Sequence, residues 1–128
     1  MELVIYNRLN TVSNRIGERM VFVSQTAGTI TLSAQLGKDM NLKKGDQIIM
    51  AQEKNSPKVW FLACAKPADE LAFVVKEIGK RLGINSNELT KRITDSFKKT
   101  ESLKFLASKT PVNIDGVSYI QLLPILNN

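Results

Sequence analysis

The chain has 128 residues, of which 43% are hydrophobic, and its 18 Lys and Arg outnumber its 12 Asp and Glu to give a formal net charge of +6. This composition is typical of one globular domain spanning residues 1–128, and it excludes extensive disorder. The lack of histidine and the single cysteine, Cys64, exclude histidine triads, the usual zinc centres and an intrachain disulfide, so we expect neither a metal nor a cofactor. The basic balance favours a polyanion such as nucleic acid as the partner.

Residues 1–19 predict a leading strand or arm. The stretch Met1–Tyr6 is apolar for only a few residues before the sequence turns polar, so we expect no signal peptide. No apolar stretch approaches the roughly 20 residues that a membrane-spanning helix needs. Cys64 lies in an apolar, strand-like run and is expected to be a buried, inert thiol. These features favour a cytoplasmic protein without a membrane partner.

The first half opens with a predicted hairpin and a short helix. Residues 22–28 and 29–32 predict two strands joined by a tight turn at Gly28, since glycine readily takes positive φ. Ser33 is a good N-cap, because its hydroxyl can accept a backbone N–H that has no partner inside the helix. The apolar spacing after it predicts a helix over about 33–41.

A second pair of strands is predicted after this helix. Residues 42–46 close the helix and reverse the chain, with Gly45 suited to a left-handed conformation. Residues 47–52 and 59–63 predict two strands, and the sequence at 54–57 predicts the turn between them.

The second half begins after a predicted boundary at residues 66–68, where Pro67 ends the preceding strand. Residues 73–79 and 82–85 are interpreted as strands because of their β-branched content. A helix over 69–83 stays open as an alternative, since the apolar residues there are also near helical spacing.

The remaining elements follow the same order as in the first half. The sequence from Ser86 predicts a helix over 86–99, with a serine N-cap followed by an acidic first turn. Residues 102–107 and 117–122 predict two strands. Pro111 and the Asp115–Gly116 pair mark the connection between them.

Similar residues recur in the same order in the two halves. The matched pairs are Phe22 and Phe73, Gly28 and Gly79, Ser33 and Ser86, Leu36 and Leu89, and Lys38 and Lys91. The repeat predicts a β-dominated α+β fold of two tandem ββαββ units, residues 20–66 and 69–128, forming one barrel with a pseudo-two-fold axis. A non-repeating α+β domain that reuses common strand and cap patterns is the alternative.

Residues 28–48 resemble the core of the AbrB/MazE/SpoVT family of DNA-binding regulators. The shared pattern is a glycine, an alternating strand, a short helix carrying a leucine, and then a leucine and a Gly-Asp turn before another strand. The resemblance covers residues 20–63 directly and residues 71–123 as a second, diverged copy. It implies a swapped-hairpin barrel, like a family dimer fused into one polypeptide.

The same resemblance implies where DNA would be contacted. Family helices commonly carry paired arginines just after the leucine, and this chain has Gly37-Lys38 in the first copy and Thr90-Lys91 in the second. We therefore expect a non-enzymatic, transcription-related DNA-binding protein, a monomer or weak homodimer, that favours duplex over single-stranded DNA. The expected nucleic-acid-binding residues are Lys38, Lys80, Arg81, Lys91 and Arg92.

Two other functions stay open. Residues 47–99 run through four strands and then a helix, an order similar to that of the whirly and Pur-alpha class of single-strand binders. Trp60 and Tyr119 would then be either base-stacking platforms or core residues. The second alternative is a protein–protein adaptor or antitoxin-like module, in which Lys91 and Arg92 are only the solvated face of a helix.

Overall fold

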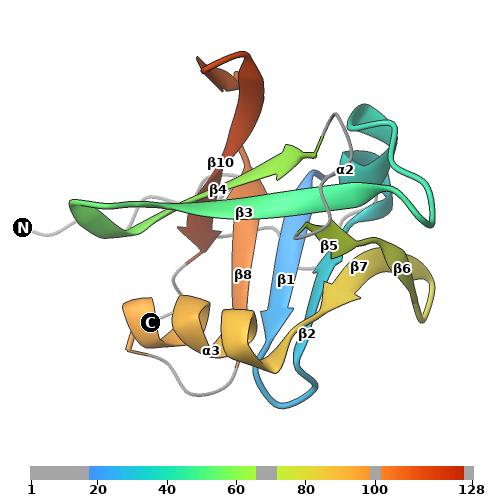
Figure 1. The fold of residues 1–128 in the computed structure, drawn as a ribbon. Helices are drawn as coiled ribbons and strands as arrows, with labels where there is room; N and C mark the ends of the chain where they lie inside the picture. The colour runs from blue at the N-terminus through green and yellow to red at the C-terminus, as the bar shows by residue number, and fades with distance from the viewer. Residues whose placement is uncertain (1–17, 66–71, 99–101, 126–128) are drawn as a thin grey trace, which may run out of the picture.

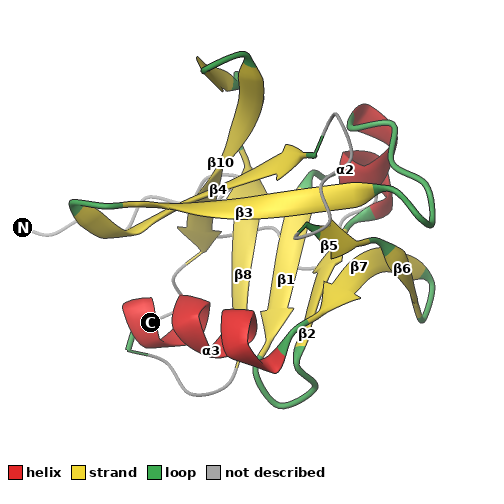
Figure 2. Ribbon diagram, viewed as in Figure 1, coloured by secondary structure: helices red, strands yellow, loops and turns green. Residues whose placement is uncertain are grey.

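The computed structural model describes residues 18–65, 72–98 and 102–125. Within them lie ten strands and two short helices, so the fold is α+β and dominated by strands (Figures 1 and 2). The elements are β1 (Met20–Ser24), β2 (Thr29–Leu32), α2 (Ala34–Asp39), β3 (Gln47–Glu53), β4 (Ser56–Cys64), β5 (Phe73–Val74), β6 (Lys76–Ile78), β7 (Arg81–Asn85), α3 (Asn87–Ser96), β8 (Ser102–Ala107), β9 (Val112–Ile114) and β10 (Val117–Ile125). The predicted boundary at 66–68 and most of the predicted leading arm lie outside the described residues.

All the strands belong to one antiparallel sheet that curls into a nearly closed barrel. Nine of them run in the order β5-β3-β4-β10-β8-β1-β2-β7-β6, and β9 is added to β10. The two ends of this order, β5 and β6, are separated in the chain by Val75 alone. The N–H of Val75 donates to the carbonyl of Asp46 at 2.7 Å, and its own carbonyl accepts from the N–H of Gly45 at 2.8 Å. One short segment, residues 73–78, therefore supplies both end strands of the order. Its first part, β5, pairs with β3, and its second part, β6, pairs with β7.

The inner face of the barrel is filled by aliphatic and aromatic side chains. Alternate positions of each strand point inward, as the two-residue period of a strand requires. The fully buried side chains include Ile30, Ile48, Leu62, Phe105 and Leu122. Removing each from water contributes about 1.5–3 kcal/mol, which makes this cluster the main source of stability.

The two helices begin where their serines predict. The Oγ of Ser33 accepts the N–H of Leu36, and the Oγ of Ser86 accepts the N–H of Leu89. Both N-cap predictions are confirmed, although α2 ends at Asp39, a little earlier than expected. α3 packs against β1, β2 and β4, whereas α2 packs against β7. Figure 1 shows the two helices at opposite corners of the barrel.

Most of the predicted strands are present, with differences in extent. The strand expected at 102–107 is β8, and the positive φ expected at Gly28 and Gly45 is found. The alternative helix over 69–83 is wrong for its described part, which forms strands. The sequence did not predict β9, because three residues between a proline and a turn carry little strand signal.

The matching of Phe22 with Phe73 is also wrong. Phe22 lies opposite Thr31 and Lys104, on the outer face of the barrel. Phe73 lies opposite the fully buried Ile48 and packs on the core. The two side chains therefore point to opposite faces of the sheet.

Trp60 of β4 and Tyr119 of β10 differ in how deeply they are buried. Trp60 is 3% exposed and its Nε1–H donates to the Oγ of Ser96 at 3.0 Å, which excludes it as a stacking platform. Tyr119 is half-buried in an edge-to-face contact with Phe61, with ring centroids 6.2 Å apart. Cys64 is half-buried rather than fully buried, and its Sγ lies 4.0 Å from the carbonyl of Met40.

Candidate nucleic-acid interface

A row of outward-facing residues crosses five neighbouring strands of the barrel. Opposite residues of an antiparallel pair share a face, and Phe22 lies between two inward-facing valines on β1. Its neighbours across the sheet must therefore point outward as well. From β8 to β6 the row reads Lys104, Phe22, Thr31, Gly83 and Lys76. A lysine thus stands at each end of a row whose middle positions are uncharged.

Arg81 lies over the middle of this row. Its guanidinium carbon is 4.0 Å from the centroid of the Phe22 ring, so a residue of β7 reaches across β2 to a residue of β1. The intervening residue, Thr31, is small enough to let the arginine pass. A cation over an aromatic face at an exposed site is worth about 0.5–1 kcal/mol, which is enough to orient the side chain.

A shallow hollow brings three of the predicted binding residues together. Lys38 comes from the last turn of α2, and Lys80 and Arg81 come from the β6–β7 hairpin. All three line one hollow of about 260 Å³. They meet because α2 packs closely on β7, where a Cβ placed on Gly37 would lie only 3.6 Å from Leu82 Cδ1.

The three cations in this hollow are exposed. Within the described part of the chain, no carboxylate lies within ion-pair distance of Lys38, Lys80 or Arg81. Their charges are therefore available to an anionic ligand. We call the surface formed by Lys38, Lys76, Lys80, Arg81, Lys104 and Phe22 the basic face.

The other two predicted residues lie elsewhere. Lys91 and Arg92 are exposed on α3, away from α2 in Figure 1. Arg92 also donates from Nε and Nη2 to the carboxylate of Glu88, one helical turn away, at 3.2 and 3.0 Å. Arg81, which is nearer to Arg92 than to Lys38 in sequence, shares a hollow with Lys38.

Sequence reasoning missed Phe22, Lys76 and Lys104 as members of this surface. Each occupies an outward position of a strand, but an outward lysine is common on any protein. What joins the three is the pairing of β1 with β8 and of β2 with β7. Those pairings link distant parts of the chain, so no local pattern reveals them.

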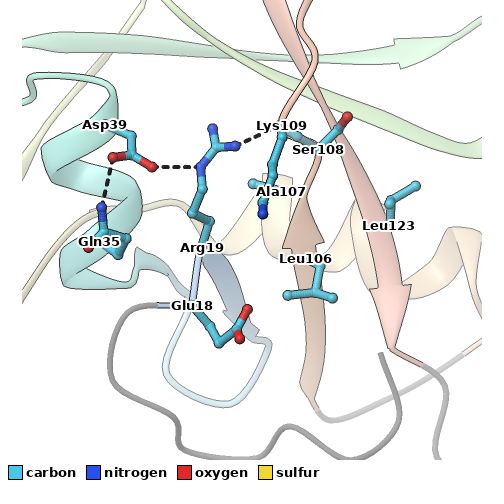
Figure 3. Close-up of a pocket in the computed structure, with 9 residues that line it drawn as sticks. All are labelled: Glu18, Arg19, Gln35, Asp39, Leu106, Ala107, Ser108, Lys109 and Leu123. Carbon is cyan, nitrogen blue, oxygen red and sulfur yellow. Dashed lines mark hydrogen bonds and ion pairs between the residues drawn. The ribbon is translucent and has the colours of Figure 1, made fainter. Parts of the chain in front are cut away.

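A larger hollow of about 450 Å³ lies beside the start of β1 (Figure 3). Arg19 crosses it, with Nε 2.9 Å from Asp39 Oδ2 and Nη1 donating to the carbonyl of Ser108 at 3.0 Å. Gln35 donates to the other oxygen of Asp39 at 2.8 Å. The Nε contact is an ion pair rather than an aligned hydrogen bond. Arg19 therefore joins α2 to the end of β8, a structural role.

The described residues also differ from a metal centre and from a membrane-spanning protein in their arrangement. No group of three or more Cys, Asp or Glu side chains there is arranged to hold a metal ion. None of the helices in that part of the chain is long and apolar enough to cross a membrane. The basic face is the surface where predicted functional residues gather. No family model, curated protein or solved structure matches the chain.

Proposed function

We propose that the chain is a non-enzymatic DNA-binding protein, related to transcription, that contacts duplex phosphates through the basic face. The observation that carries the proposal is the meeting of Lys38, Lys80 and Arg81 around one hollow. Lysine and arginine side chains that are not paired with a carboxylate release bound counterions from DNA when they neutralise phosphates, and this supplies much of the affinity of such proteins.

We further propose that the barrel consists of two tandem ββαββ units related by a pseudo-two-fold axis, in the swapped-hairpin manner of AbrB/MazE/SpoVT-like proteins. The strand pairings support this. The hairpins β1–β2 and β3–β4 correspond to β6–β7 and β8–β10. The exchanged pair β1–β8 corresponds to β5–β3. The two remaining pairings, β2–β7 and β4–β10, join equivalent strands, as expected where an axis crosses a sheet.

Salt dependence of binding to a mixed-sequence duplex tests the proposal. Each phosphate contact contributes a slope of about −0.9 to the plot of log affinity against log salt concentration. The double variant Lys38→Gln with Lys80→Gln should therefore reduce the magnitude of the slope by about 1.8. Both side chains are exposed, so the fold should change in stability by less than about 0.5 kcal/mol.

The matched control is Lys54→Gln with Lys58→Gln, which removes the same charge from exposed lysines around the β3–β4 turn. Figure 1 places that turn on the side of the molecule away from α2 and β7. We expect the control to keep the wild-type slope. Equal losses in both variants would show a general charge effect and remove the basic face as the interface. Absence of duplex binding by the wild type at low salt would remove duplex DNA as the ligand.

The α3 group is expected to contribute less. In the variant Lys91→Gln with Arg92→Gln, one of the two lost charges is already neutralised by Glu88. The slope should therefore fall by about one contact or less. A loss larger than that of the Lys38 and Lys80 variant would place the interface on α3 instead.

A single-strand binder is the second candidate, and the Phe22–Arg81 pair favours it. The half-buried Phe22 ring and the exposed Arg81 guanidinium lie on the same outer face, and both kinds of group can stack on unpaired bases. Competition between a duplex and its separate strands decides between the two. Phe22→Leu should weaken duplex binding only slightly, through the loss of its contact with Arg81, and should weaken single-strand binding more strongly if bases stack on the ring.

A further inference from the structure

The hairpin formed by β9 and the start of β10 projects from the barrel, at the top of Figure 1. Its turn consists of Asp115 and Gly116, with φ of 53° and 81°. Two consecutive left-handed residues make the tight two-residue turn whose twist matches that of paired strands. The hairpin is thus well formed although only three residue pairs hold it together.

One side of this hairpin is apolar and exposed. Val112 lies opposite Tyr119, and Ile114 lies opposite Val117, so the four side chains share one face. We call these four residues the apolar arm. Val112 and Ile114 are 42% and 48% exposed, and the patch continues to Phe61 through its contact with Tyr119. Contiguous exposed apolar surface of this kind marks an interaction site.

The outer edge of β9 is open to another strand. Among the described strands β9 pairs only with β10. In a two-residue hairpin the pair that closes the turn, here Ile114 and Val117, is hydrogen-bonded. The next pair is not, so the N–H and C=O of Asn113 point away from β10. Proteins usually protect such an edge with charged residues, and β9 carries none.

We propose that this edge pairs with β9 of a second copy of the chain. Antiparallel pairing centred on Asn113 is self-complementary, because each Asn113 donates to and accepts from the other. Val112 of each copy then lies opposite Ile114 of the other, on the same face. The two apolar arms merge into one surface with two-fold symmetry, which is the usual symmetry of homodimers.

The charges at the ends of β9 favour a second copy over an unrelated strand. In the same register Asp115 of one copy lies opposite Pro111 of the other, two positions along the chain from its Lys109. Both charged residues are exposed. The dimer therefore gains two such approaches between opposite charges, one on each side of the axis. This inference does not depend on DNA binding.

Sedimentation equilibrium of the full chain tests the proposal, with Asn113→Pro as the first variant. Proline removes the N–H that faces the second copy and leaves the apolar arm unchanged. It is tolerated on an edge strand whose N–H faces solvent. We expect a concentration-dependent dimer for the wild type, and a rise of the dissociation constant by about tenfold or more for the variant.

A charge exchange keeps the test decisive if proline disturbs the hairpin. Lys109→Asp alone and Asp115→Lys alone should each weaken the dimer. Either substitution gives residues 109 and 115 the same sign of charge, and this pair occurs once on each side of the two-fold axis. The double variant should regain most of the wild-type association. A wild type that stays monomeric at all accessible concentrations overturns the proposal. So does a dimer that none of these variants weakens, or a double variant no better than the singles.

Discussion

The first half of the chain, residues 20–64, and the second half, residues 73–125, each contain one short helix between groups of strands, but they differ where their hairpins project. Around the β3–β4 turn most of the exposed residues are polar or charged, and Pro57, which has no backbone N–H to donate, lies near the start of β4. Gln52 also donates its side-chain amide to the carbonyl of Pro57 at 2.7 Å. The β9–β10 hairpin has exposed valine and isoleucine instead. One hairpin is thus protected against pairing with another chain, and the other is not.

A second difference lies where the two halves meet. On the outer face Thr31 of β2 lies opposite Gly83 of β7. A Cβ at Gly83 would collide with the carbonyl oxygen of Ile30 and lie 2.9 Å from Thr31 Cα. The strands approach too closely for a side chain from both. The close β2–β7 pairing therefore depends on a glycine on one of its two strands.

The largest expected effect tests this close approach. Gly83→Ala should destabilise the fold by about 3 kcal/mol, because the methyl group meets backbone atoms that cannot rotate away. The free energy of unfolding in urea measures it. The control is Gly37→Ala in α2, where the added Cβ would lie at an ordinary contact distance from Leu82. This substitution should leave the stability unchanged or raise it by about 0.5–1 kcal/mol. Similar stabilities for both variants would contradict the account of the β2–β7 crossing.

A smaller effect separates the two N-cap serines. The Oγ of Ser33 accepts from the N–H groups of Met20 and Leu36 and donates to the carbonyl of Glu18. The Oγ of Ser86 accepts from the N–H of Leu89. Ser33→Ala should therefore cost about 2 kcal/mol and Ser86→Ala about 1 kcal/mol. Equal costs, measured by urea unfolding, would mean that only the cap bond matters in each half.

The smallest expected effect concerns the two ion pairs. Glu88 and Arg92 are 77% and 70% exposed on α3, so Glu88→Gln should cost about 0.3–0.5 kcal/mol and less in high salt. Asp39 pairs with the partly buried Arg19, and Asp39→Asn should cost about 1 kcal/mol with little salt dependence. Thermal unfolding at two ionic strengths distinguishes them. If the cost of Asp39→Asn depended more strongly on salt than the cost of Glu88→Gln, the Arg19–Asp39 pair would be the more solvent-screened of the two.

The helices and most strands could be predicted because their signals are local. Ser33 and Ser86 stand at the helix starts, and the alternation in residues 102–107 marks β8. The change of partner at Val75 could not be predicted, since residues 73–78 contain no glycine or proline and resemble one continuous strand in the sequence. Its two parts pair with β3 and β7, which lie on either side of it in the chain.

The candidate site was predictable only in part for the same reason. Lys38 and Lys91 each follow a helical leucine by two residues, a spacing that puts them on the side of the helix away from that leucine, and both are exposed. Which cations gather depends on the packing of α2 against β7, a contact between the two halves. Arg81 is nearer to Arg92 in sequence, whereas in space it lies with Lys38.

The pairing of β1 with β8 bears on how the protein folds as it leaves the ribosome. The bond from Arg19 to Ser108 spans 89 positions of the chain, and β1 forms its register with β8 over the same long interval. While the first half is being synthesised, β1 can pair only with β2. Its other edge stays unpaired until β8 has been synthesised. Barrel closure must wait until β8 and β10 have been synthesised, and long-range closure of this kind slows folding. The nascent first half would thus expose the edges and apolar faces that chaperones recognise.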